Sequence, residues 1–205
     1  MTYPEFINSK HLTVESSGFE QDLGNNLLFD WQQAVVKWAC LKGRSAIFAD
    51  CGMGKSAIQI EFGTEVALYT EMPVLIVAPL AVSAQTIREA EKFEREVRPA
   101  RSQVDVTDMG VYITNYEMLG HFDASRFGGV ILDESSILKH HDSKIREQII
   151  AMFRDTPYKM ACTATPAPND YMEFGNHAEF LGVMTRTRCW QPFLCTTAAT
   201  PPNGG

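Results

Sequence analysis

The sequence predicts an α/β fold in which a parallel sheet carries helices on both faces. Short apolar runs recur along the chain with little polar alternation, as expected of strands that are covered on both sides. Longer helix-like stretches separate these runs, and this alternation is typical of a parallel sheet. The expected strands span residues 46–49, 74–78, 111–114, 130–132 and 159–162. The expected helices span residues 28–41, 55–69, 83–96 and 143–153.

Composition places the chain among folded proteins that do not bind membranes. Of its 205 residues, 45% are hydrophobic and 21% are charged, which is sufficient for one substantial core. The longest apolar stretch, residues 74–82, contains Pro79 and is well short of the roughly 20 residues that a membrane-spanning helix needs. The N-terminal residues lack the basic and apolar regions of a secretion signal, so we expect a cytoplasmic protein.

Charge and cysteine content exclude several classes of partner. The 18 basic and 25 acidic residues give a net charge of −7, so any nucleic-acid contact must be local. One group of basic residues alternates with glutamates, and we expect it to form a solvated, salt-bridged helix face: Lys92, Arg95, Arg98 and Arg101. The five cysteines are odd in number and form no CxxC pair, which predicts reduced thiols rather than disulfides or structural zinc.

A glycine-containing turn between the first strand and the second helix resembles a phosphate loop. Residues 46–56 read AIFADCGMGKS, with Ala49 in place of the first glycine of the motif. Glycines let the backbone direct its N–H groups at phosphate oxygens, and the helix that follows adds its positive dipole. Lysine would reach the β- and γ-phosphates, and the serine hydroxyl would bind Mg²⁺. The expected nucleotide cradle comprises Asp50, Cys51, Gly52, Met53, Gly54, Lys55 and Ser56. A glycine-rich turn with an exposed lysine is the simpler alternative.

A second chemical signal is the acidic pair at the end of the strand at residues 130–132. Asp133 and Glu134 follow the strand directly, at the sheet edge where open α/β sheets bind ligands. Asp133 would hold Mg²⁺, and Glu134 would orient or deprotonate the attacking water. We expect this strand to lie next to the phosphate-loop strand. Alone, the pair would fit a solvated loop or a helix N-cap better than a catalytic site.

Two further segments are candidates for nucleotide contact and for coupling. Gln32 precedes the phosphate loop and could read an adenine edge, while Phe29 or Trp31 could pack against the base. The tryptophans Trp31 and Trp38 fit better as core residues of an amphipathic helix. After the strand at residues 159–162, the hydroxyls of Thr163 and Thr165 could couple the acidic pair to a moving partner, or could cap a turn.

Six segments in sequence order (LFDWQ, ADCGMGKS, VAPLAVSAQ, ITNYEML, ILDESS and CTATP) resemble the first motor domain of superfamily-two helicases and their Swi/Snf-like relatives. The resemblance implies a RecA-like phosphate-loop NTPase fold, with ATP and Mg²⁺ as cofactors. It makes Gln32 the adenine-reading glutamine, Lys55 the phosphate-loop lysine, and Asp133 and Glu134 the DExx box. Thr163 and Thr165 correspond to the motif that couples hydrolysis to domain movement. The segments along the nucleic-acid backbone correspond to Ala78, Pro79, Leu80, Thr114, Asn115 and Tyr116.

The resemblance also sets the expected domain organisation. Residues 1–24 form an N-terminal extension, residues 25–182 the ATP-binding helicase domain, and residues 183–205 an irregular tail that a truncation or a frame shift would explain. The stretch at residues 169–182 resembles phage-encoded members, which would place the protein in the host cytoplasm. Two departures stand out. Ser135 and Ser136 replace the usual end of the DExx box, and the second motor domain does not follow.

The resemblance favours an ATP-binding motor domain of a helicase or translocase acting on nucleic acid, DNA rather than RNA. Its hydrolysis would be weak here, because relatives take arginines from a second motor domain, which a partner protein would have to supply in trans. The alternative is a non-catalytic module that binds ATP or nucleic acid. A small-molecule kinase is disfavoured because no lid-like arginine cluster follows the acidic strand.

Overall fold

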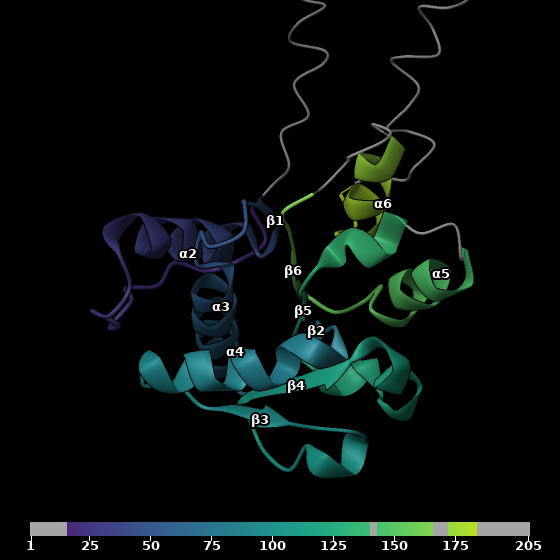
Figure 1. The fold of residues 1–205 in the computed structure, drawn as a ribbon, viewed down its shortest axis with the longest axis horizontal. Helices are drawn as coiled ribbons and strands as arrows, with labels where there is room; N and C mark the ends of the chain where they lie inside the picture. Colours follow the sequence, from purple (N-terminus) through teal and green to yellow (C-terminus); the bar gives the residue numbers. More distant parts are fainter. Residues whose placement is uncertain (1–15, 140–142, 166–171, 184–205) are drawn as a thin grey trace, which may run out of the picture.

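The centre of the computed structural model is a six-stranded sheet in the order β1-β6-β5-β2-β4-β3, in which every neighbouring pair is parallel (Figure 1). The structure describes residues 16–139, 143–165 and 172–183. The strands are β1 (Arg44–Phe48), β2 (Val74–Ala78), β3 (Val97–Pro99), β4 (Val111–Asn115), β5 (Gly129–Leu132) and β6 (Tyr158–Thr163). The predicted fold class and the five predicted strands are therefore confirmed.

Two features of the sheet differ from the prediction. The strand β3 was missed because it has three residues at the sheet edge, among them Arg98 and Pro99. The acidic strand β5 was expected beside the phosphate-loop strand β1, and this was wrong because β6 lies between them. Strand order depends on contacts between distant segments, which the local sequence pattern does not report.

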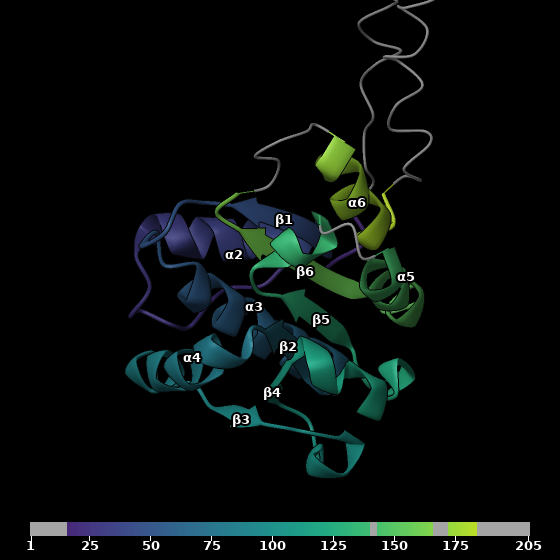
Figure 2. The same ribbon diagram turned by 45° about the vertical axis from the view of Figure 1, so that its right-hand side comes forward.

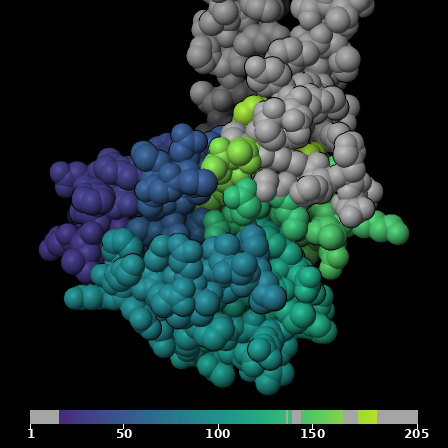
Figure 3. Space-filling model, in the orientation of Figure 1, coloured from purple at the N-terminus to yellow at the C-terminus, as the bar shows by residue number. Residues whose placement is uncertain are grey.

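Helices cover both faces of the sheet (Figures 1 and 2). One face carries α2 (Asp30–Lys42), α3 (Lys55–Thr70) and α4 (Leu80–Lys92). The other carries α5 (Ser143–Met152) and α6 (Met172–Phe180), with four short 3-10 helices, η1 (Gln103–Asp105), η2 (Tyr116–His121), η3 (Ala124–Arg126) and η4 (Ser135–Lys139). The space-filling view shows the described residues packed into a continuous body (Figure 3). No helix in the described ranges is both long and apolar enough to span a membrane.

Two helix predictions needed correction. The helix expected at residues 83–96 is α4, which begins at Leu80 directly after Pro79 and ends at Lys92, before Glu94 takes a left-handed backbone conformation with φ 54°. The expected burial of the tryptophans in α2 was wrong, because Trp31 is 42% exposed and Trp38 is 44% exposed. The face that packs on the core consists of Gln32, Val36, Ala39 and Cys40.

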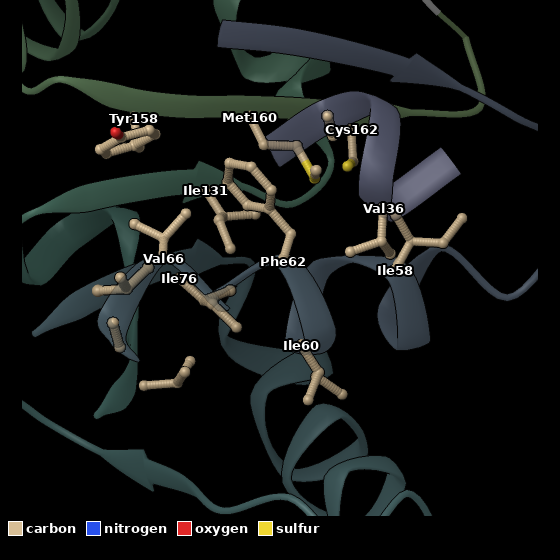
Figure 4. Close-up of a cluster of buried hydrophobic side chains, with 14 of the residues drawn as sticks. Val36, Ile58, Ile60, Phe62, Val66, Ile76, Ile131, Tyr158, Met160 and Cys162 are labelled. Carbon is tan, nitrogen blue, oxygen red and sulfur yellow. The ribbon is translucent and has the colours of Figure 1, made fainter. Parts of the chain in front are cut away.

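The apolar core has two layers, one on each side of the sheet. On the α3 side, the strand residues Ile131, Met160 and Cys162 point toward Ile58 and Phe62 of α3 (Figure 4). All five residues of β2 are buried, which explains why this strand reads as a continuous apolar run. Burial raises the pKa of the Cys162 thiol to about 12, so it is a neutral core group. Cys40, Cys51 and Cys162 are free thiols, as predicted for them.

A buried polar cluster joins α3 to the segment after α4. The Glu61 carboxylate is 1% exposed and accepts two hydrogen bonds from Arg95, at 2.9 and 3.0 Å, and one from Asn25 at 2.9 Å. The expected solvated helix face was therefore wrong, because α4 ends at Lys92. Arg95 lies beyond that end and pairs with the core, Arg98 belongs to β3, and Arg101 follows β3. Glu65 is 4% exposed in the same cluster, and burial raises the pKa of its carboxyl.

We expect Glu65→Gln to stabilise the fold more at pH 8 than at pH 4. Burial is the main cause of the raised pKa of Glu65, and the charge of Glu61 raises it further. A carboxyl whose pKa is raised in the folded state makes its full contribution to stability at low pH, where it is protonated. This contribution is lost as the pH rises through the folded pKa. Glutamine stays neutral at every pH. Urea unfolding at both pH values measures the difference, with the exposed Glu91→Gln on α4 as control. A larger gain at pH 4 would contradict this account.

Candidate nucleotide site

The phosphate loop connects β1 to α3, and its backbone is built to receive an anion. Gly52 and Gly54 have left-handed backbone conformations, with φ 81° and 67°. Gly54 is the N-cap residue of α3 and provides no side-chain cap, and no acidic residue stands in the first turn. The first N–H groups of a helix need external partners, and its dipole favours negative charge there. The turn therefore offers backbone donors and a positive helix end to a phosphate group.

The side chains of the predicted cradle lie around this turn. The Lys55 ammonium donates to the carbonyl oxygens of Ala49 at 2.8 Å and Asp50 at 3.0 Å, which folds the lysine back over the loop. Ser56 is partly buried at the start of α3. The other loop side chains are exposed to solvent: Asp50, Cys51 and Met53.

The predicted base-binding residues lie at the start of α2, beside the loop. Gln32 is 3% exposed, and its Oε1 accepts a hydrogen bond from the backbone N–H of Phe29 at 3.0 Å. Its Nε2 lies so close to Gly54 that a Cβ at that position would stand 2.3 Å away. Phe29 is 70% exposed. The structure thus brings Gln32 against the loop and leaves the Phe29 ring accessible.

Thr163 brings the loop and the acidic pair to one edge of the sheet. It is the last residue of β6, and its carbonyl accepts from the N–H of Ala49 at 3.3 Å. Its hydroxyl donates to Glu134 Oε1 at 2.8 Å. The backbone N–H of Thr165 donates to the same hydroxyl oxygen at 3.1 Å, and the Thr165 side chain is exposed. The carboxyl ends of β1, β6 and β5 therefore meet around one fully buried threonine.

The acidic turn is held from several elements. The N–H of Asp133 donates to the carbonyl of Val77 at 2.8 Å, and the N–H of Glu134 donates to Asp133 Oδ1 at 3.0 Å. Glu134 has a left-handed backbone with φ 51°, a strained conformation for a non-glycine residue. Burial raises the pKa of the Asp133 carboxyl, while hydrogen bonds from Gln59 and from the Glu134 backbone, together with the Lys55 charge, counteract this shift.

Tyr116, predicted as a nucleic-acid contact, has its hydroxyl turned toward the acidic turn. That hydroxyl donates to the carbonyl oxygen of Asp133 at 2.7 Å. Burial raises the pKa of the Tyr116 phenol well above its usual value, and the charges of Asp133 and Glu134 add to this effect. The phenol is therefore a neutral donor that fixes the peptide between the two acidic residues.

Sequence reasoning missed the partners of the acidic turn in α6. The hydroxyl of Ser135 is hydrogen-bonded to His177 Nε2 at 3.0 Å, and both residues are buried. The His177 ring also packs edge-on against Phe48, the last residue of β1. Asn176 donates to the carbonyl of Leu138 at 3.0 Å. The departure at Ser135 from the DExx pattern was the available signal, because a buried hydroxyl needs a partner.

The predicted nucleic-acid residues separate into two groups. Four of them line one cavity of about 410 Å³ together with Glu134, namely Pro79, Leu80, Asn115 and Tyr116. Leu80 is 71% exposed, and Ile137 and Ile145 complete the apolar part of the lining. The side chain of Thr114 does not reach this cavity, because it is 3% exposed within β4.

The side chains present suit a magnesium ion shared with a nucleotide rather than one held by protein alone. The described residues contain no group of three or more His, Cys, Asp or Glu side chains that could hold a metal. Asp133 and Ser56 offer a carboxylate and a hydroxyl, the oxygen donors that Mg²⁺ prefers. Mg²⁺ bound to ATP takes most of its ligands from phosphates and water, so two protein donors are sufficient.

A phosphate loop and an acidic pair on one edge of a parallel sheet define a RecA-like phosphate-loop NTPase fold. The profile of the SNF2-related domain matches residues 31–193. The chain therefore belongs to the SNF2-related domain family, in agreement with the resemblance seen in its motifs. No curated protein matches the chain.

Solved structures share this fold at low sequence identity. The Sulfolobus solfataricus SWI2/SNF2 ATPase core in complex with dsDNA is 17% identical, with a TM-score of 0.67, over 93% of this chain and 43% of that one. The UvsW helicase of bacteriophage T4 is 14% identical, with a TM-score of 0.61, over 90% and 66% of the two chains. The Pyrococcus furiosus Hef helicase domain is 15% identical, with a TM-score of 0.60, over 74% and 36%. The present chain thus spans less than two thirds of these structures.

Alanine at Gly54 should destabilise the fold more than alanine at Gly52. Both positions have positive φ, so either alanine introduces a strain of about 1–2 kcal/mol. A Cβ at Gly52 would meet nothing within 4 Å, whereas a Cβ at Gly54 would force the Gln32 amide to move. The Gln32 bond to the Phe29 backbone would then weaken. Urea unfolding of the two variants measures the difference, and equal losses would show that Gln32 does not pack on the loop as described.

Proposed function

We propose that this chain is the ATP- and Mg²⁺-binding motor domain of a DNA helicase or translocase. The observation that carries the proposal is the contact of Thr163 with both the phosphate loop and Glu134. It joins a cradle for phosphates to a carboxylate that can act on water, as phosphoanhydride hydrolysis requires. Membership of the SNF2-related domain family supports the same function.

In the proposed mechanism, the residues of the loop bind the triphosphate and those of the acidic turn act on water. The backbone N–H groups from Gly52 to Ser56 hold phosphate oxygens, and Lys55 leaves its two loop carbonyls to contact the β- and γ-phosphates. Glu134 accepts a proton from the attacking water while Thr163 holds its Oε1. Phe29 packs against the adenine and Gln32 reads its edge.

Ser56 and Asp133 would hold the magnesium ion of MgATP. When bound, the ion neutralises the charge that develops on the phosphates during transfer. Asp133 suits this role because its carboxylate lies in the electrostatic field of Lys55, close to the loop. Its backbone is fixed by Val77 and Tyr116, so it can hold a ligand position without rearrangement.

DNA is the proposed nucleic-acid partner. The cavity lined by Pro79, Leu80, Asn115 and Tyr116 also contains Glu134, so a strand bound there would lie beside the hydrolytic residue. The Sulfolobus SWI2/SNF2 core that shares this fold was solved with dsDNA, which favours DNA over RNA. We propose that this contact transmits strand binding to hydrolysis through Tyr116 and the acidic turn.

Full turnover would need a second motor domain. The chain spans 43% of the SWI2/SNF2 core it matches. In the helicases that its motifs resemble, a second motor domain supplies arginines to the γ-phosphate. An arginine finger contributes a factor of about 10³–10⁵ to turnover. The chain alone should therefore bind ATP and hydrolyse it slowly.

Lys55→Ala should weaken MgATP binding by about 10- to 100-fold, because it removes charge-assisted hydrogen bonds to phosphate.

Glu134→Gln should keep the affinity for MgATP and lower the rate of single-turnover hydrolysis by about 10²–10⁴-fold, because a neutral amide cannot accept the proton. Titration with a fluorescent ATP analogue and hydrolysis of labelled ATP, each with and without duplex DNA, measure both effects. The exposed Lys37→Ala is the charge-matched control.

The outcomes separate the candidate functions. Failure of the wild-type chain to bind MgATP would overturn the proposal. A non-catalytic ATP-binding module would instead bind MgATP without hydrolysing it. Neither Glu134→Gln nor a second motor domain added in trans would then change the rate of hydrolysis. Transfer of phosphate to a small metabolite would identify a kinase.

A further inference from the structure

Gln59 is a buried polar residue on the apolar face of α3, directly behind the acidic turn. It stands four residues after Lys55, so one turn of helix separates it from the phosphate loop. It is 0% exposed, and its sequence neighbours Ile58 and Ile60 belong to the apolar core. Its Nε2 donates to Asp133 Oδ1 at 2.8 Å.

The direction of this bond determines how the carboxylate lies. The backbone N–H of Glu134 donates to the same oxygen, Oδ1, at 3.0 Å. Two donors on one oxygen fix the rotation of the Asp133 carboxylate without engaging Oδ2. An ionised carboxylate accepts only, so the amide must present its NH₂ group to Asp133.

The carbonyl half of the amide has no partner in the described part of the core. Its Oε1 is buried and has no hydrogen-bond partner among the described residues. Burying an unpaired carbonyl destabilises a fold, and an apolar side chain of the same length would avoid this. The cost is understandable if the bond to Asp133 serves the site, because the other partner of the amide is the neutral Cys162 thiol.

We propose that Gln59 is a positioning residue that turns Oδ2 of Asp133 toward the magnesium ion of MgATP. The inference rests on the proposed function, because it assigns Asp133 to the metal. Since Lys55 and Gln59 stand on successive turns of α3, the helix that follows the phosphate loop also orients the metal-binding carboxylate. The single helix α3 thereby fixes the position of the Asp133 carboxylate relative to the residues that bind the phosphates.

The test compares nucleotide affinity with and without magnesium in Gln59→Leu and Gln59→Met. Loss of the outer partner of a metal ligand typically weakens metal binding by about 10- to 100-fold. We therefore expect the gain in ATP affinity on adding Mg²⁺ to fall by about that factor, while ATP affinity in EDTA stays at the wild-type value. Methionine is unbranched and guards against a packing fault caused by leucine. Gln85→Leu, on the exposed face of α4, is the matched control.

A merely structural role would lower the affinity equally with and without Mg²⁺, and that result would overturn the inference. A second measurement needs no nucleotide. In a double-mutant cycle of Gln59→Leu and Asp133→Ala, the inference requires non-additive shifts of the urea midpoint, whereas additive shifts would show that the bond is absent in solution. If the wild-type chain bound no ATP, the proposed function would fail, and this cycle would still decide whether Gln59 holds Asp133.

Discussion

The hydrogen bond from Thr163 to Glu134 is the contact on which the arrangement of the site depends. Strand β6 lies between β1 and β5, so the phosphate loop and the acidic turn are not on neighbouring strands. A residue at the end of β6 must therefore connect them, and Thr163 does so with its carbonyl toward Ala49 and its hydroxyl toward Glu134. Because the threonine is fully buried, water does not compete for these bonds. Any shift of β6 along its axis would change both halves of the site together.

The acidic turn is a strained element that its surroundings keep in place. A left-handed conformation at Glu134 costs about 1–2 kcal/mol, and such residues persist only where neighbouring contacts fix them. Here those contacts come from the neighbouring strand β2 and from η2 and α6, which cover the same face of the sheet. Tyr116 holds the carbonyl of Asp133, and His177 holds the hydroxyl of Ser135. A carboxylate held in this way needs little reorganisation to act on water.

The sequence was sufficient to locate the loop and the acidic pair, because each follows an apolar run at the end of a parallel strand. It was not sufficient for the residues that orient them. Gln59 and His177 lie on helices, and a local pattern does not reveal which helix position faces a strand end that is distant in the sequence. Trp31 shows the same limit, since aromatic spacing in α2 predicted burial on the wrong face. Strand order was missed for the same reason, because it is decided by contacts between segments far apart in the chain.

The carboxylates of the two acidic residues are held from opposite faces of the sheet. Gln59 of α3 binds the Asp133 carboxylate from the face that carries the phosphate-loop helix, whereas Thr163, two residues after Ala161 of the opposite core layer, binds the Glu134 carboxylate from the other face. Glu134 also lines the cavity that contains Leu80 and Tyr116, and Asp133 does not. A carboxylate beside the loop helix suits a metal ligand, because its charge then faces phosphates that a cation must bridge. A carboxylate on the cavity side suits a proton acceptor that responds to what the cavity binds. The roles proposed for Asp133 and Glu134 agree with this difference, although the two residues are adjacent in the sequence.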